Sequence, residues 1–234
     1  MPKPRTRSDS RKEEFLDLAE ELFADLGYEN TSVDRLISGL GVSKGAFYHH
    51  FRSKSALLDA ALERWLLGAE AHLKEVLAGK APATEKLRNF MLSLNGVKSE
   101  NRESSLQVGK FLLQDANAIL LGRMRCAARS RLVPLLTTII EQGALEGEFQ
   151  LENPQLVARI VWDICEAMDD ILGRTLIETG GKRIGPGELL NIYNTYTRAI
   201  ERVIGAPEKS LYLADDTIFQ SWIEATSRNE LVGV

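Results

Sequence analysis

The stretch VSKGAFYHHFRSKSALL, residues 42–58, concentrates side chains that can bind a polyanion. It contains two lysines and an arginine, a tyrosine and two histidines, and no acidic residue. Lys44 can donate to guanine O6 and N7 in the DNA major groove. Tyr48 and His50 offer polar tips suited to phosphate oxygens, and Lys54 lies in the first turn of the next expected helix, where the helix dipole favours an anion. The spacing therefore predicts a DNA-contacting surface.

The charge distribution supports this prediction better than the total charge does. The net charge of −4 argues against a protein coated in positive charge. Residues 1–12, however, carry five basic side chains against one acidic side chain, and residues 43–54 carry three basic side chains and no acid. Positive charge is thus expected at an N-terminal arm and at the quoted stretch.

Four helices are expected to position these groups, the second and third of them short. Apolar residues recur with helical spacing from Phe15 to Leu26, after a possible capping box at Ser10 and before a glycine stop. Further helix starts are expected at Thr31, Ser43 and Ser53, and the glycine at position 41 ends the second helix.

Two short helices joined by a tight glycine turn are typical of a helix-turn-helix, whose second helix enters the major groove. On the third expected helix Phe47 and Phe51 are the inward positions, which leaves an open face of Lys44, Gly45, Ala46, Tyr48 and His49. The alternative is a helical surface whose lysines are merely solvated. The glycine turn, the short helices and the acid-free run together favour DNA binding.

Residues 12–62 resemble the N-terminal DNA-binding domain of the TetR family of bacterial transcriptional regulators. The ordered set F, LGY, TSV, L, GVSKG, FYHHF, SK and LL carries the resemblance. The resemblance implies a homodimer that binds a double-stranded DNA operator, a helical C-terminal domain that binds a small molecule, and repression that this ligand relieves. By position, it implies a groove-facing set (Lys44, Gly45, Ala46, Tyr48, His49) and a phosphate-contacting set (Ser32, Tyr48, His50, Lys54). We also count the expected capping residues Thr31 and Ser43 with the DNA-contacting set. The pair Ser38-Gly39 departs from the family pattern and weakens helix propensity.

The whole chain is expected to be all-α, with a three-helix helix-turn-helix domain over 1–54 and a helical-bundle ligand-binding and dimerisation domain over 55–234. After the linker GKAPAT, helices are expected near 85–97, 105–115, 118–143, 155–178 and 187–204, followed by a less regular tail from Gly205.

Two groups of residues are expected to work in the second domain. Six aromatic and thioether side chains could line an adaptable apolar pocket for a small hydrophobic effector, although each is also suited to an ordinary core. These six residues are Phe90, Met91, Phe111, Met124, Trp162 and Met168. The uncharged segment LLNIYNTYT begins a helical stripe that predicts a dimer interface, and the alternative is an internal core helix. The stripe consists of Leu189, Ile192, Tyr193, Tyr196, Ile200 and Val203.

Other kinds of chemistry find little support. Asp163, Glu166 and Asp170 share a helical face but are expected to pair with arginines and not to hold a metal. Arg123, Arg125, Arg129 and Arg131 are expected to be solvated, with an acidic-ligand contact as the alternative. No catalytic motif or cofactor-binding pattern is present, so neither an enzyme nor a cofactor is expected. The chain has no membrane-length apolar run and is expected in the cytoplasm. DNA binding that is constitutive, or controlled by a protein partner, is left open.

Overall fold

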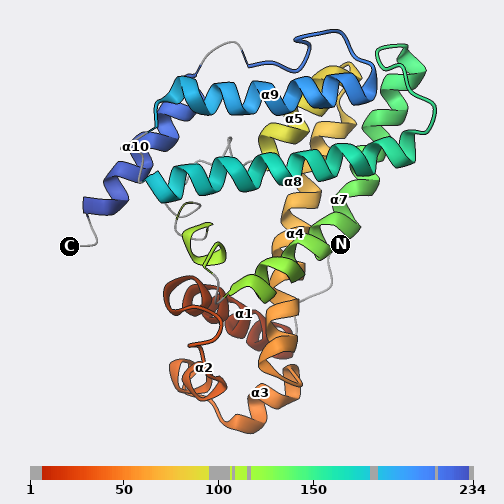
Figure 1. The fold of residues 1–234 in the computed structure, drawn as a ribbon. Helices are drawn as coiled ribbons and strands as arrows, with labels where there is room; N and C mark the ends of the chain where they lie inside the picture. Colours follow the sequence, from red (N-terminus) through yellow and green to blue (C-terminus); the bar gives the residue numbers. More distant parts are fainter. Residues whose placement is uncertain are drawn as a thin grey trace. The chain divides into compact units, whose positions relative to one another are not determined.

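Every regular element in the described part of the chain is an α-helix (Figure 1), which confirms the all-α prediction. The computed structural model describes residues 7–94, 106, 109–114, 117–179, 184–213 and 216–231. Its labelled helices are α1 (Arg7–Leu26), α2 (Val33–Leu40), α3 (Lys44–His50), α4 (Lys54–Ala78), α5 (Ala83–Leu94), α7 (Ala118–Glu146), α8 (Pro154–Thr179), α9 (Pro186–Ile204) and α10 (Thr217–Leu231). The helix expected over 105–115 lies partly outside the described residues.

The chain divides into two units, and the division does not fall at residue 54. The head consists of Met1–Ala69 and Phe111–Ala127, and the C-terminal unit consists of Glu70–Lys110 and Ala128–Val234. The expected boundary is wrong because the start of α4 buries Leu57 and Leu58 in the core of the head. Leu120 of α7 belongs to the same core, so the head is discontinuous in sequence.

Aromatic side chains from α1, from α3 and from the residue after α3 meet at the centre of the head. Phe15 of α1 and Phe47 of α3 are fully buried, and their rings pack edge to face with centroids 5.5 Å apart. Phe51 packs against Phe15 in the same way, at 6.0 Å. These contacts fix the rotation of α3 and point its remaining positions outward, since aromatic pairs prefer edge-to-face geometry.

Glycines set the geometry of α2. Gly41 follows its last residue in the left-handed conformation, with φ of 62°, and its N–H donates to the carbonyl of Ser38, so the predicted stop is confirmed. A Cβ at Gly39 would lie 2.8 Å from the Leu18 side chain of α1. The weak helix former at position 39 therefore lets α2 approach α1 closely.

The first helix starts earlier than its sequence signals indicate. α1 begins at Arg7, so Ser10 lies inside the helix and the predicted capping box is wrong. At its other end the expected stop is confirmed, because Gly27 follows Leu26 with a φ of +89°.

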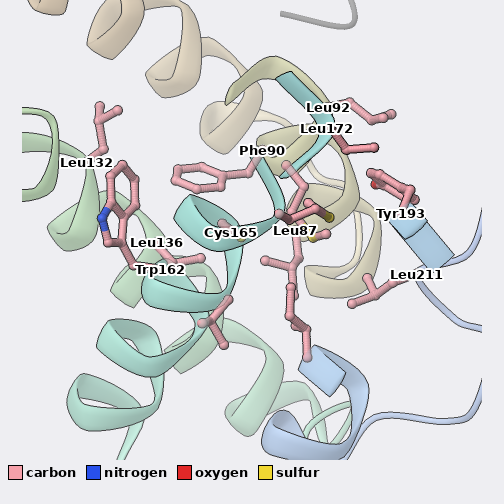
Figure 2. Packing of buried hydrophobic residues seen from close by; sticks show 14 of the residues in the cluster. Leu87, Phe90, Leu92, Leu132, Leu136, Trp162, Cys165, Leu172, Tyr193 and Leu211 are labelled. Atoms are coloured by element: carbon pink, nitrogen blue, oxygen red, sulfur yellow. The ribbon is translucent and has the colours of Figure 1, made fainter. Parts of the chain in front are cut away.

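In the C-terminal unit α8 and α9 run alongside each other, and α10 packs against both (Figure 1). Their buried side chains form one core with α5 and the second half of α7, part of which Figure 2 shows. The expected irregular tail instead contains α10, whose Phe219, Trp222 and Ala225 are buried at helical spacing. That spacing was the available signal, and the polar residues between these positions weakened it.

Two buried or half-buried acids tie the C-terminal unit together. Glu148 accepts from the backbone N–H of Thr84 at 2.8 Å, in the first turn of α5. Glu201 is 2% exposed and accepts from the backbone N–H groups of Lys209 and Leu211. The Glu148 carboxylate therefore holds the start of α5 in place, and the Glu201 carboxylate holds the loop after α9. Within the described ranges, no helix is long and apolar enough to cross a membrane.

Candidate functional site

Two capped helices and one glycine turn build the outward face of the head. Ser32 caps α2 by accepting from the backbone N–H of Arg35 at 3.1 Å, and Ser43 caps α3 by accepting from Ala46 at 3.3 Å. Both serines are exposed, and each hydroxyl keeps its hydrogen for another acceptor. The α2–turn–α3 unit thus has the helix-turn-helix geometry expected from the sequence.

The predicted groove-facing residues lie on the exposed side of α3. Lys44, Gly45, Tyr48 and His49 are exposed, and Ala46 is half-buried. Tyr48 leaves 49% of its surface exposed while its ring packs edge to face on Phe47, with centroids 5.3 Å apart. The buried neighbour therefore orients an exposed phenol.

Lys44 has an acidic neighbour on α2. Its Nζ lies 3.4 Å from the Asp34 carboxylate, and both side chains are largely exposed. An exposed pair of this kind is weak. The Lys44 ammonium can therefore exchange this partner for a base edge.

The predicted phosphate-contacting residues separate into two groups. Ser32 and Tyr48 are exposed, and His50 is half-buried at the end of α3. Burial lowers the pKa of His50, and the positive charges of His49, Lys12 and Arg11 lower it further. His50 thus meets an approaching phosphate mainly as a neutral imidazole at neutral pH. Of the basic arm, residues 1–6 lie outside the described residues.

The assignment of Thr31 to the DNA-contacting set is wrong. Thr31 is fully buried, and its hydroxyl donates to the carbonyl of Gly27 at 2.9 Å and lies 3.2 Å from that of Leu22. Ser32, and not Thr31, caps α2. The sequence offers two adjacent hydroxyl residues, and only the helix register decides which of them faces outward.

Lys54 is engaged within the head. Its ammonium donates to the carbonyl of Tyr28 at 2.8 Å, lies 3.4 Å from the carbonyl of Glu29 and sits 4.2 Å from the centroid of the Tyr28 ring. These contacts attach the start of α4 to the turn between α1 and α2. They give Lys54 a structural role that the sequence did not indicate, beside the phosphate contact predicted for it.

An arginine on α4 gathers three carboxylates from α1. Arg64 contacts Glu13, Asp17 and Glu20 at 3.0, 2.7 and 2.6 Å. These hydrogen bonds raise the pKa of Arg64 above its ordinary value, and the bond to Glu20 has the largest effect. Burial opposes this shift. This cluster is not among the predicted features, although the sequence carries a signal for it, since acids at i, i+4 and i+7 share one side of a helix.

The residues proposed for a ligand pocket do not lie together. Phe90, Met91, Trp162 and Met168 are buried in the core of the C-terminal unit. Phe111 and Met124 instead pack against the core of the head. The six-residue pocket is therefore wrong as a single site, because α7 and the segment before it contribute to both units.

The proposed dimer stripe is divided in a different way. Leu189, Tyr193 and Ile200 are fully buried in the core of a single chain, so they have no surface to offer a second copy. Ile192, Tyr196 and Val203 are half-buried against the same core. At these three positions α9 is therefore an internal core helix and not a dimer interface.

The remaining charged candidates form ion pairs within each unit. Asp170 pairs with Arg174 at 2.8 Å, as expected, whereas Asp163 pairs with Arg129 of α7 and not with Arg159. Arg123 contacts Asp59 at 3.2 Å, and Arg131 contacts Glu70 at 2.9 Å. The expectation of simple solvation is therefore wrong for Arg123, Arg129 and Arg131. Among the described residues, no group of three or more potential metal ligands is gathered.

Comparison with known proteins agrees with this geometry. The family model described as "Bacterial regulatory proteins, tetR family" matches residues 15–61. The HTH-type transcriptional repressor KstR2 of Mycobacterium tuberculosis is 31% identical over 161 residues, which cover 66% of this chain and 78% of that protein.

Solved structures share the fold. A TetR-family transcriptional regulator from Pectobacterium atrosepticum is 20% identical, with a TM-score of 0.63, over 87% of this chain and all of that chain. The transcriptional regulator FadR from Bacillus subtilis, solved in complex with stearoyl-CoA, is 19% identical, with a TM-score of 0.58, over 83% of this chain and 98% of that one. The extent of the KstR2 match, the family model and the helix-turn-helix head agree that the chain belongs to the tetR family and is a DNA-binding transcriptional regulator, not an enzyme.

Proposed function

We propose that the protein is a repressor that binds a palindromic operator as a homodimer and leaves it when a small hydrophobic molecule binds the C-terminal unit. The observation that supports DNA binding is the exposed face of α3, which consists of Lys44, Gly45, Tyr48 and His49. The buried Phe47 and Phe51 hold the opposite side of the helix in the core of the head. Residues without bulky side chains at positions 45 and 46 let the helix backbone approach the bases, while Lys44 supplies a donor for guanine.

An apolar stripe on α8 supports the homodimer. Leu156, Ile160 and Ile171 leave 53%, 47% and 39% of their surfaces exposed. With 100° per residue they fall within one narrow sector of the helix, which also contains the exposed Ala167. Exposed apolar residues aligned in this way favour a protein interface, and a twofold axis would place each stripe against its own copy. We therefore assign the interface to this face of α8, with the half-buried Ile192, Tyr196 and Val203 of α9 beside it.

The core of the C-terminal unit supports an effector with an apolar body. Phe90, Met91, Trp162 and Met168 lie in that core, and methionine side chains adapt their shape to a ligand more readily than branched ones. A structural relative of the same fold, FadR, is in complex with stearoyl-CoA. The effector would release DNA only by favouring a form of the dimer that does not fit the operator, since equal affinity for both forms shifts nothing.

Operator selection followed by release tests this proposal. The full chain would be used to select binding sites from randomised duplexes, and a palindrome with half-sites about one helical turn apart or somewhat more is expected. Affinity should fall steeply with added salt because phosphate contacts release counterions. The variants Tyr48→Ala and Lys44→Ala should weaken binding, and Lys44→Ala should also relax base preference. His72→Ala, on the part of α4 outside the head, serves as the control.

Full operator affinity in a folded Lys44→Ala, Tyr48→Ala double variant would contradict the DNA-contact assignment. Selection of a site without twofold symmetry would contradict the homodimer. If compounds that stabilise the protein never change operator affinity, control by a ligand is wrong, and a partner-controlled or constitutive DNA-binding protein is the better description.

A further inference from the structure

The core of the C-terminal unit buries polar atoms that have no hydrogen-bond partner. Among the described residues, these atoms include the Tyr193 hydroxyl, the Arg88 Nε, the Ser210 Oγ and the Trp162 Nε1. Tyr193 is fully buried among apolar side chains. Buried polar groups are nearly always satisfied in folded proteins, so a group of them without partners points to an occupant that would supply the missing bonds.

Three of these atoms belong to one neighbourhood. Arg88 of α5 donates from Nη2 to the backbone carbonyl of Ser210. Leu87 and Leu211, the chain neighbours of Arg88 and Ser210, belong to the same core as Tyr193 (Figure 2). Burial raises the pKa of the Tyr193 phenol, on which Cys165, Arg88 and Asp169 also act electrostatically. Figure 2 shows Tyr193 and Trp162 on opposite sides of the cluster, so Trp162 does not belong to this neighbourhood.

We infer that Tyr193 and Arg88 anchor an oxygen acceptor, a carbonyl or a carboxylate, of an otherwise apolar effector. This inference rests on the proposed ligand response and names the chemistry of the ligand. The Arg88 Nε–H can only donate, and the Tyr193 hydroxyl can donate to the same oxygen. An ammonium group cannot accept from the Arg88 Nε–H, so it would leave that donor without a partner.

The surroundings determine the rest of the ligand. Apolar side chains from four parts of the chain belong to the same core as Tyr193: Leu87 of α5, Leu172 of α8, Ile200 of α9 and Leu211 of the following loop. These side chains favour a hydrocarbon body. Asp169, which is near enough to act on the Tyr193 phenol, opposes a doubly charged group such as a phosphate monoester. Because Tyr193 is 0% exposed, binding has to displace core side chains, and the adaptable Met91 and Met168 are in the same cluster.

Matched probes test the anchor on the full chain. Decanoate, methyl decanoate and decylamine share one body, and phenylbutyrate, its methyl ester and phenylbutylamine share another. Thermal shift and calorimetry should show binding of the acid or the ester in at least one series and none of the amines. Tyr193→Phe should weaken that binding by roughly two- to tenfold, the loss of one hydrogen bond. Its unliganded melting temperature should not fall, because the change removes an unsatisfied hydroxyl.

Two further variants separate the anchor from general packing. Tyr212→Phe removes a hydroxyl that accepts from Arg198 Nε at 2.7 Å, and it should leave probe affinity unchanged. Arg88→Lys keeps the charge but removes the Nε–H, and it should weaken the acid and the ester. The inference is overturned if no acid or ester binds, if an amine binds as well as its acid, or if Tyr193→Phe and Tyr212→Phe have equal effects.

Operator binding is measured separately, so the two proposals fail in different ways. Probes that bind through Tyr193 without releasing the operator would support the anchor and contradict the ligand response. An effector without any oxygen acceptor that releases the operator would support the ligand response and contradict the anchor.

Discussion

Gly45 is the residue at which folding and DNA binding make opposite demands. It lies exposed inside α3, and a Cβ there would meet the Ser43 hydroxyl oxygen at 3.8 Å, an ordinary contact. Replacing a glycine inside a helix by a residue with a side chain stabilises the helix by roughly 0.5–1 kcal/mol. The head itself therefore has room for a side chain at position 45.

The change Gly45→Leu is expected to raise or preserve the melting temperature and to abolish operator binding. The added side chain would occupy the space between α3 and the bases. Gly68→Leu is the matched control, because Gly68 is also an exposed helical glycine with no atom within 4 Å of its Cβ position. Melting curves and operator titrations check both variants. Normal operator affinity in Gly45→Leu would show that α3 does not enter the groove.

His50 predicts a pH dependence of DNA binding. Its pKa in the free head is lowered, chiefly by burial and then by His49, Lys12 and Arg11, whereas a phosphate favours the imidazolium form. Operator binding should therefore take up a proton, and affinity should rise as the pH falls below about 6.5 toward the lowered pKa. His50→Gln should reduce this dependence, and His72→Gln should not.

The same pKa has an opposite effect on stability. The unfolded chain binds the His50 proton more readily than the folded head does, so this group destabilises the head as the pH falls through the same window. Titrations therefore have to remain at pH values where the circular dichroism of the head is unchanged. If operator affinity depends on pH in the same way in His50→Gln as in the wild type, His50 does not contact a phosphate.

At the scale of helices, Arg64 joins α4 to α1. Replacing it by methionine keeps the apolar stem but leaves Glu13, Asp17 and Glu20 on one side of α1 without their shared cation. Like charges at this spacing repel. Because the acids are partly exposed and screened, the expected loss of stability is on the order of 1 kcal/mol.

Thermal unfolding of Arg64→Met measures this effect. Added salt should narrow the difference from the wild type, because it screens the repulsion among the acids. Arg52→Met changes an exposed arginine between α3 and α4 and should have almost no effect. A melting temperature unchanged in low salt would mean that the cluster does not stabilise the head.

Local sequence signals predicted most helices and the outward face of α3, but they could not assign side chains that are decided by longer-range packing. Gly41 and the Ser43 cap are short-range devices that depend on a few neighbouring residues. Thr31 and Lys54 bind carbonyls of the α1 end and the turn after it. Their spacing alone does not distinguish these contacts from phosphate contacts.

Periodicity also could not tell which partner covers a helix. The stripe on α9 indicates burial but predicts a second copy as the cover, whereas Leu189, Tyr193 and Ile200 are buried by the same chain. On α8 the exposed Leu156 and Ile160 alternate with residues that face the core, so both sides of the helix are apolar. Only the packing within one chain shows which side is left uncovered.

At the scale of the whole molecule, the α8 stripe predicts how the dimer can be separated. Ile160→Glu would place a charge at the centre of the proposed interface, and sedimentation should show a monomer. Operator affinity should fall because two half-sites would no longer be bound by one linked pair of heads. Leu145→Glu, at an apolar residue that is 89% exposed on α7, is the control and should remain a dimer. A dimeric Ile160→Glu variant would move the interface elsewhere.

The discontinuous head limits how this protein can be rebuilt. A chimaera made by joining residues 1–54, or even Met1–Ala69, to a different sensor domain would lack Leu120, which is 5% exposed in the core of the head. It would also lack Phe111, whose ring lies against Gly27, and the Arg123 contact to Asp59. A transplant of DNA specificity therefore has to carry the segment Phe111–Ala127 with the head. Exchanging only the exposed residues of α3 would leave these packing contacts intact.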